Sequence, residues 1–214
     1  MADQERGRKS VKTGAVKKYV KKSGSMALIE GGERQWLATG SGLYPLDGWP
    51  KMTAEELMTL MEIPKDEQPM YPIRMQTAEE LPEAWQQLIA EAGEDSEAKP
   101  TGLTIGAEGV VVQPMYTRHG LKFAESAAMA VLKDCKKEIG WWFRETGSGG
   151  GALVAKIGML TAGVICPQGG WITDEVEEWL ADTSMAASKA AQRRREAEAE
   201  AAKTVQLRME GTGA

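Results

Sequence analysis

The chain has 214 residues and a formal net charge of −5, with 42% hydrophobic and 27% charged residues. This length and composition are ordinary for a soluble globular protein with one large domain or two small ones. No apolar run approaches the roughly 20 residues needed to cross a bilayer, and the N-terminus is too polar for a signal peptide. We therefore expect a cytoplasmic protein without membrane contacts.

Histidine and cysteine are too scarce for the common metal sites. His119 is the single histidine, and the two cysteines, Cys135 and Cys166, have no Cys-x-x-Cys spacing. Zinc sites and disulfide frameworks need more of these residues at closer spacing. We expect neither a metal ion nor another cofactor, and we expect both cysteines to be small buried hydrophobes.

Charge is unevenly distributed along the chain. Residues 1–22 hold eight Lys or Arg against two acids, whereas residues 66–98 hold nine acids against one basic residue, Arg74. A basic arm beside an acidic middle indicates nucleic-acid contact at one end and protein contact at the other, although a solvated mobile tail is an equal alternative. The candidate contacts to nucleic-acid phosphates are Lys17, Lys18, Lys21 and Lys22.

The first fifth of the chain favours short strands. Residues 1–10 are polar and aperiodic, which is typical of a disordered arm. Residues 11–20 alternate in a way compatible with an edge strand whose lysines discourage pairing with another chain. Residues 26–30 and 35–38 flank a Gly-Gly pair and predict a hairpin. A third strand at residues 43–46 lies at a sheet edge or ends early, because its proline cannot donate a ladder hydrogen bond.

Helix signals follow. Thr53 and Glu56 have the spacing of a capping box, and the helix that they open ends before Pro64, since the residue before proline disfavours the α conformation. A second helical segment covers residues 77–92 and is interrupted at Pro82, which suits the first position of a new turn.

The middle of the chain predicts a boundary and then a second group of strands. Residues 93–100 are acidic and end in Lys-Pro, which is typical of a linker. Residues 103–105 and 110–113 predict a hairpin. Residues 122–135 place apolar side chains three or four apart, as on one helical face, and residues 139–166 contain β-branched and aromatic runs punctuated by glycine. The predicted order is helix, strand, glycine-rich turn, strand, strand.

Beyond Pro167 the chain becomes rich in Ala, Glu, Arg and Lys, which predicts a helix that protrudes into solvent or folds fully on a partner. The expected fold class is α+β, with two strand-plus-helix units that contain antiparallel sheets. In chain order we expect a disordered basic arm (1–10), an N-terminal unit (11–92), a linker (93–100), a second unit (101–172) and a long charged C-terminal helix (173–208).

No residue pattern carries a recognisable catalytic chemistry. Adjacent acids such as Glu55 and Glu56 point away from each other on helices, so no general acid/base pair is nominated. Residues 147–151 are glycine-rich like a phosphate loop, but a strand rather than a helix follows, which favours a hairpin turn. We expect no catalytic residues.

Aromatic and basic side chains are the remaining candidates for a ligand or partner surface. Trp142 and Arg144 are two positions apart on a predicted strand and share a face that could stack on a base or nucleotide, although burial of the tryptophan between layers is favoured. Tyr116, Arg118 and His119 form a second candidate, which could contact an anion. A simply exposed loop histidine is the commoner alternative.

Two resemblances can be stated, one that covers most of the chain and one that covers residues 121–166. Gln35-Trp-Leu-Ala, Leu43-Tyr-Pro-Leu-Asp-Gly and Thr53-Ala-Glu-Glu-Leu, with Gly151-Ala-Leu-Val-Ala and Val164-Ile-Cys-Pro167 later, resemble a family of uncharacterised proteins carried by phages and prophages of Firmicutes. The order of elements over residues 121–166 resembles a half-domain of the DNA sliding-clamp fold, in which a helix packs behind a curved sheet. The first resemblance implies a bacterial host cell. The second is topological and implies no encirclement of DNA.

Three functional hypotheses follow, in this order. The first is a non-enzymatic phage accessory protein that binds and inhibits a host defence system, either by binding a host protein or by sequestering a nucleotide signal. The second is a nucleic-acid-binding accessory factor of phage DNA replication or recombination, which would use the basic arm. The third is an enzyme of unknown class. Each is compatible with a homo-oligomer.

Overall fold

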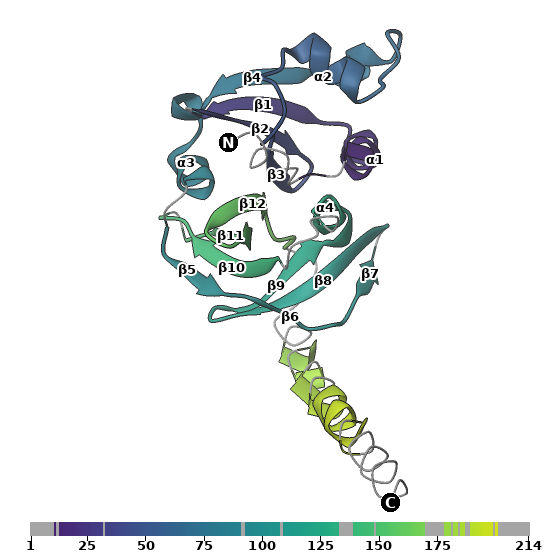
Figure 1. Cartoon of the computed structure of the whole chain (residues 1–214), viewed down its shortest axis with the longest axis vertical. Helices are drawn as coiled ribbons and strands as arrows, with labels where there is room; N and C mark the ends of the chain where they lie inside the picture. The colour runs from purple at the N-terminus through teal and green to yellow at the C-terminus, as the bar shows by residue number, and fades with distance from the viewer. Residues whose placement is uncertain are drawn as a thin grey trace, which may run out of the picture.

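The computed structural model of the chain describes residues 11, 13–31, 33–90, 93–107, 109–132, 139–147 and 149–169, and towards the C-terminus residues 178–180, 182–183, 185–186, 189–198 and 200. Helices and strands pack into one body with two sheets (Figure 1). The fold class is therefore α+β, with mostly antiparallel sheets, as the sequence predicts.

The larger sheet has eight strands and contains segments from both halves of the chain. Its spatial order is β4 (Ile73–Thr77), β1 (Met26–Gly31), β2 (Arg34–Thr39), β3 (Gly42–Pro45), β12 (Leu160–Ile165), β11 (Gly151–Ile157), β10 (Gly140–Glu145) and β5 (Asp95–Glu97). Neighbouring strands are antiparallel except for the parallel pair β1 and β4.

The pairing of β3 with β12 joins the two halves. Leu43 pairs with Val164 and Gly42 with Ile165, while the other side of β3 pairs with β2. The hairpin of β1 and β2 is confirmed, and β3 ends at Pro45 as predicted. It is an interior strand, however, so the alternative of an edge position is wrong.

The smaller sheet is built around β8 (Val110–Thr117). This strand pairs with β6 (Lys99–Pro100), β7 (Ile105–Ala107) and β9 (Gly120–Glu125), all antiparallel. The predicted hairpin of residues 103–105 and 110–113 corresponds to β7 and β8. Residues 93–100 do not form the predicted linker, because β5 belongs to the larger sheet and β6 to the smaller one.

Helix α1 (Thr13–Ser23) replaces the edge strand predicted for residues 11–20. Val16, Tyr19 and Val20 are its buried residues, and their spacing is that of one helical face. The run of lysines between these residues conceals the helical pattern. Consequently, the lysines predicted to protect a sheet edge lie on a helix instead.

The other helices follow the local signals more closely. Helix α2 (Ala54–Leu60) has the predicted capping box between Thr53 and Glu56. A 3₁₀ turn η2 (Ala78–Glu80) precedes α3 (Glu83–Ile89), which begins after Pro82 as predicted, and η1 (Gln68–Met70) lies between α2 and β4. Helix α4 (Ser126–Ala130) is shorter than predicted, since residues 122–125 belong to β9.

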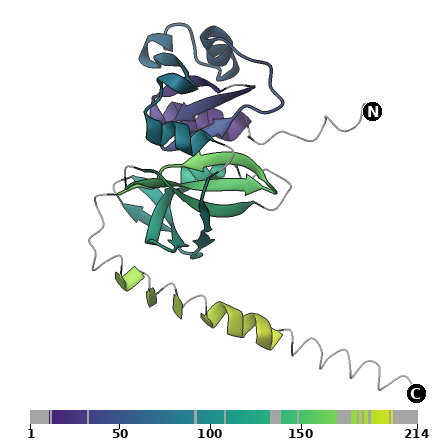
Figure 2. The ribbon, with the colours of Figure 1, turned by 90° about the vertical axis from the view of Figure 1, so that its left-hand side faces the viewer.

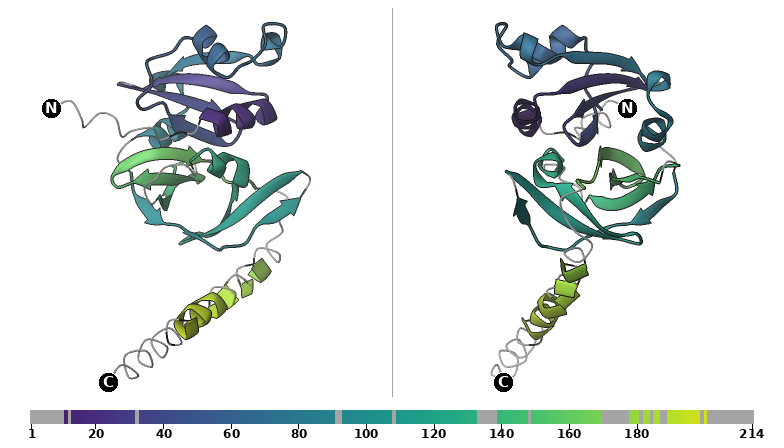
Figure 3. Two further views of the ribbon diagram at one scale, coloured as in Figure 1. Left: turned by 45° about the vertical axis from the view of Figure 1, so that its right-hand side comes forward. Right: turned by 180° about the vertical axis from the view of Figure 1, so that it is seen from behind.

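Side chains of the larger sheet alternate between two apolar clusters. Leu28 and its partner Leu37 face the main cluster, which also contains buried residues of α1, α2 and α4, whereas Ile29 and its partner Trp36 face a second cluster with Leu88 of α3. Helices therefore cover both faces of this sheet. Helices α1 and α4 lie side by side in both views of Figure 3.

The described residues between 178 and 200 are helical, and Figure 2 shows them leading away from the sheets. Leu180 is buried against apolar residues of β8 and β9. Much of the predicted helix 173–208 and the whole predicted arm 1–10 lie outside the described residues. None of the described helices combines the length and apolar character needed to cross a bilayer.

Candidate functional site

Four lysines occupy the face of α1 that points away from the core. Successive residues are rotated by about 100° around a helix, so the positions between and after the buried valines fall on the opposite side. We call the set Lys17, Lys18, Lys21 and Lys22 the lysine face. Lys18, Lys21 and Lys22 are exposed and Lys17 is partly buried.

Two members of the lysine face are paired with acids. Lys17 Nζ lies 2.5 Å from Glu62 Oε1, and Lys22 Nζ lies 2.9 Å from Glu125 Oε1. Lys18 and Lys21 form no ion pair in the part of the chain that the structure describes, although the charge of Lys21 helps to lower the pKa of Glu62. These two ammonium groups are therefore the ones left to attract an external anion.

A buried hydrogen-bond network holds α1 against the second half of the chain. Tyr19 Oη donates to Glu125 Oε2 over 2.7 Å, and Ser41 Oγ donates to the same oxygen over 3.1 Å. The Ser41 backbone N–H donates to Tyr19 Oη over 2.9 Å. Since Glu125 ends β9 just before α4, the network fixes α1 beside α4.

The ionisation states of this network follow from its contacts. Burial alone would raise the pKa of the Glu125 carboxyl, but hydrogen bonds from Lys22 and Tyr19 outweigh it, and the pKa is lowered. Burial raises the pKa of Tyr19 to about 12. Glu125 is therefore a carboxylate and Tyr19 a neutral donor at neutral pH.

Arg144 is a buried structural residue and not part of an open ligand surface. Its side chain is 2% exposed, and it donates to Asp95 from Nε over 2.6 Å and from Nη2 over 2.9 Å. Its Nη1 donates to the carbonyls of the last turn of α3, those of Gln87, Leu88 and Ala90. Arg144 is therefore too buried to form the predicted ligand-stacking surface with Trp142.

The surroundings of Arg144 depend on a glycine and a second cation. A Cβ on Gly93 would lie 2.6 Å from Arg144 Nε, so only glycine fits there. Lys156 Nζ contacts Asp95 at 2.5 Å and lies 5.2 Å from the ring centre of Trp142, which is partly buried. Burial would raise the pKa of Asp95, but hydrogen bonds from Arg144 and Lys156 lower it overall.

His119 lines a pocket of about 530 Å³, whereas its neighbour Arg118 is not among the lining residues. Arg118 Nε donates to His119 Nε2 over 2.6 Å, and both residues contact the Glu145 carboxylate. Among the residues that line this pocket are Lys122 and Phe143. Tyr116, the third predicted member, packs instead against the small apolar cluster of β8 and β9.

Sequence reasoning missed Lys122, Phe143 and Glu145 as members of this pocket. It assigned Lys122 to a helix, although Leu121 and Phe123 are buried on either side of it, the alternation expected of a strand. Glu145 comes from a different hairpin, and no local pattern links it to residue 119.

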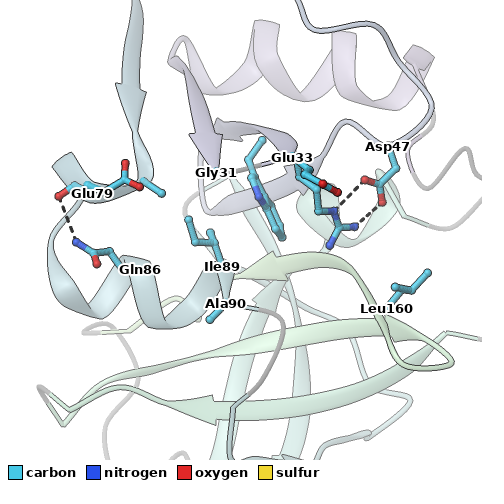
Figure 4. Close-up of a pocket in the computed structure, with 11 residues that line it drawn as sticks. Gly31, Glu33, Asp47, Glu79, Gln86, Ile89, Ala90 and Leu160 are labelled. Carbon is cyan, nitrogen blue, oxygen red and sulfur yellow. Dashed lines mark hydrogen bonds and ion pairs between the residues drawn. The ribbon is translucent and has the colours of Figure 1, made fainter.

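A second pocket of about 650 Å³ lies between the β1–β2 turn, α3 and the β11–β12 turn (Figure 4). Arg34 Nε donates to Asp47 Oδ1 over 2.9 Å, its Nη2 donates to the Thr161 carbonyl over 3.2 Å, and the guanidinium lies 5.3 Å from the Trp36 ring centre. With Arg34 engaged in this way, the exposed acids Glu33 and Glu79 give the rim a negative charge. An anion is disfavoured there.

Comparison of the chain with protein-family models, with curated proteins and with solved structures finds no match. The resemblances to a phage family and to a clamp half-domain therefore stay predictions. Across the described ranges, no three His, Cys, Asp or Glu side chains form a group that could hold a metal ion.

We predict that Arg144→Met lowers the free energy of unfolding by about 3 to 5 kcal/mol, because it leaves the Asp95 charge buried without its main partner. Urea unfolding followed by tryptophan fluorescence measures this loss. Arg74→Met on the exposed edge strand β4 is the matched control, with an expected change within about 0.5 kcal/mol. Equal losses in the two variants would contradict the structural role of Arg144.

We also predict a loss of stability in acid. Folding lowers the pKa of Glu125 from its ordinary value of 4.5, so the unfolded state binds more protons in acid. The Glu125 carboxylate therefore stabilises the fold fully above about pH 4.5. This stabilisation is lost as the pH falls from there through the lower pKa of the folded state. Urea titrations between about pH 7 and about pH 3 should show this fall. In Glu125→Gln the fall should be smaller, and an unchanged acid limb in that variant would refute the prediction.

Proposed function

We propose that this protein is a non-catalytic binding protein that holds the phosphate backbone of a nucleic acid on the lysine face of α1. The single observation that carries the proposal is the pair of exposed ammonium groups, Lys18 and Lys21, neither of which forms an ion pair with an acid among the described residues. Lysine side chains on one side of a rigid helix supply the sequence-independent attraction that phosphates require.

The distribution of charge supports the same surface. The chain as a whole carries −5, so a polyanion is repelled by most of the molecule and is attracted only where positive charge is concentrated. In the sequence, Arg6, Arg8, Lys9 and Lys12 directly precede α1 and would add to the field of the lysine face. The acid-rimmed pocket of Figure 4 is unsuitable for the same ligand.

The clamp-like interpretation draws support from α1 and α4. One helix comes from each half of the chain, and both contribute buried residues to the main apolar cluster; α1 contacts β2 of the larger sheet, and α4 contacts β8 and β9 of the smaller one. A helix behind the sheet in each half is the arrangement that the resemblance implies. We therefore propose the specific role of an accessory factor in phage DNA replication or recombination.

The absence of a catalytic role is part of the proposal. The acids with lowered pKa values that lie deepest, Asp95 and Glu125, are fully occupied by cations and hydroxyl groups that hold elements together. Their contacts favour a permanent carboxylate rather than a group that exchanges protons with a substrate. Inhibition of a host defence system remains a second candidate, and its nucleotide-sequestering form requires a small-molecule site.

We predict that Lys18→Glu/Lys21→Glu weakens binding to labelled single-stranded and duplex DNA by more than about tenfold, since two phosphate contacts become repulsive. Fluorescence anisotropy between about 50 and about 200 mM salt measures the affinity, and the salt dependence should fall by roughly one unit of slope per contact removed.

The control for this experiment is Lys65→Glu/Lys99→Glu, which changes the net charge equally at exposed lysines outside α1. It should retain most of the binding. An equal loss in both double variants would show that only total charge matters. No binding of the unaltered protein to either DNA at about 50 mM salt would overturn the proposal.

A further inference from the structure

The pocket beside His119 differs from the acid-rimmed pocket in size, lining and charge. Its volume of about 530 Å³ lies within the range of ordinary ligand sites, and its lining is mixed. The apolar lining residues include Leu121, Phe123 and Phe143, and the polar ones include His119, Lys122 and Glu145. It is formed by β9, β10, the turn after β10 and residues 167–169, so it is separate from the lysine face.

Lys122 provides the charge that decides what this pocket can take. Its Nζ lies 5.5 Å from the ring centre of Phe143, and no acidic side chain among the described residues pairs with it. The imidazole of His119 is 5.6 Å from the same ring. A half-buried ammonium held over an aromatic face keeps its affinity for an anion when no described acid forms an ion pair with it.

The acid that lines this pocket already has a cationic neighbour. Glu145 Oε1 is close to His119 Nε2 and lies 3.6 Å from Nη2 of Arg118. Arg118 and Lys122 together exceed the one carboxylate by one positive charge, even with the imidazole neutral. The pocket therefore favours a ligand with negative charge at the Lys122 end.

The turn after β10 leaves the pocket open. A Cβ on Gly151 would lie 2.5 Å from the Phe143 ring and 2.6 Å from the Arg144 carbonyl, so this position admits glycine alone. Gly149 has a φ of +79°, which side-chain-bearing residues rarely adopt, and Gly150 also lines the pocket without a side chain. The glycines thus bring the backbone close to Phe143 while no side chain of theirs fills the space.

We propose that this pocket binds a mononucleotide, with the phosphate held by Lys122 and the nucleoside beside the Phe143 ring. Charged donors suit a phosphate, and apolar side chains suit a nucleoside. The site is independent of the lysine face, and its ligand is of the class that sequestration of a nucleotide signal requires.

The test is isothermal titration calorimetry with AMP, UMP, adenosine and inorganic phosphate. AMP or UMP should bind, adenosine at least about tenfold more weakly because it lacks the charged contact, and Lys122→Met should weaken nucleotide binding by at least about tenfold. Lys65→Met, at an exposed lysine outside the pocket, should change nothing.

A thermal melt of Lys122→Met guards against a folding defect, and Lys122→Arg, which keeps the charge, should retain binding. Equal affinity for AMP and adenosine, binding of inorganic phosphate alone, or no heat with any nucleotide would each overturn the proposal. Lys18→Glu/Lys21→Glu should leave nucleotide binding intact, so failure of this inference is distinguishable from failure of the nucleic-acid proposal.

Discussion

The buried pair of Arg144 and Asp95 is the constraint on which one end of the molecule depends. Removing a guanidinium and a carboxylate from water costs several kcal/mol for each ion, and the loss is offset only when nearly every donor and acceptor is satisfied. The Arg144 guanidinium donates two hydrogen bonds to the Asp95 carboxylate and also donates to backbone carbonyls at the end of α3. Strand β5, strand β10 and helix α3 are thereby fixed to one another.

A second carboxylate, that of Glu125, also links separate elements through hydrogen bonds, here at α1. Glu125 joins Tyr19 and Lys22 of α1 to the strand that precedes α4. Lys22 therefore has two roles, because it neutralises Glu125 and also belongs to the lysine face. A phosphate bound there competes with Glu125 for that ammonium, which leaves Lys18 and Lys21 as the pair that can bind without loosening the fold.

The sequence was most informative where structure depends on neighbours along the chain. The capping box at Thr53, the hairpin of β1 and β2 and the new turn at Pro82 are all local, and all are present. The strand predicted in place of α1 was wrong because the lysine pairs at 17–18 and 21–22 hide the helical spacing of the buried residues Val16, Tyr19 and Val20. The linker prediction failed because the acidic composition that indicates solvent exposure includes Asp95, whose partner is far away in sequence.

The candidate sites show the same limit. Arg118 and His119 are adjacent in the chain and contact each other, but only His119 lines the pocket, and strand pairing brings Phe143 and Glu145 to it. Arg144 is predicted as a ligand contact because it shares a strand face with Trp142, and a single sequence gives no indication that a charged residue is buried with its partner.

The pairing of β3 with β12 also determines when the sheet can be completed during synthesis. Leu43 leaves the ribosome long before Val164, its partner, and until then the open side of β3 presents unpaired N–H and C=O groups. A nascent or prematurely terminated chain that stops short of β12 therefore exposes an apolar edge that can recruit another strand. Closure of the body is a late event that protects the chain from self-association.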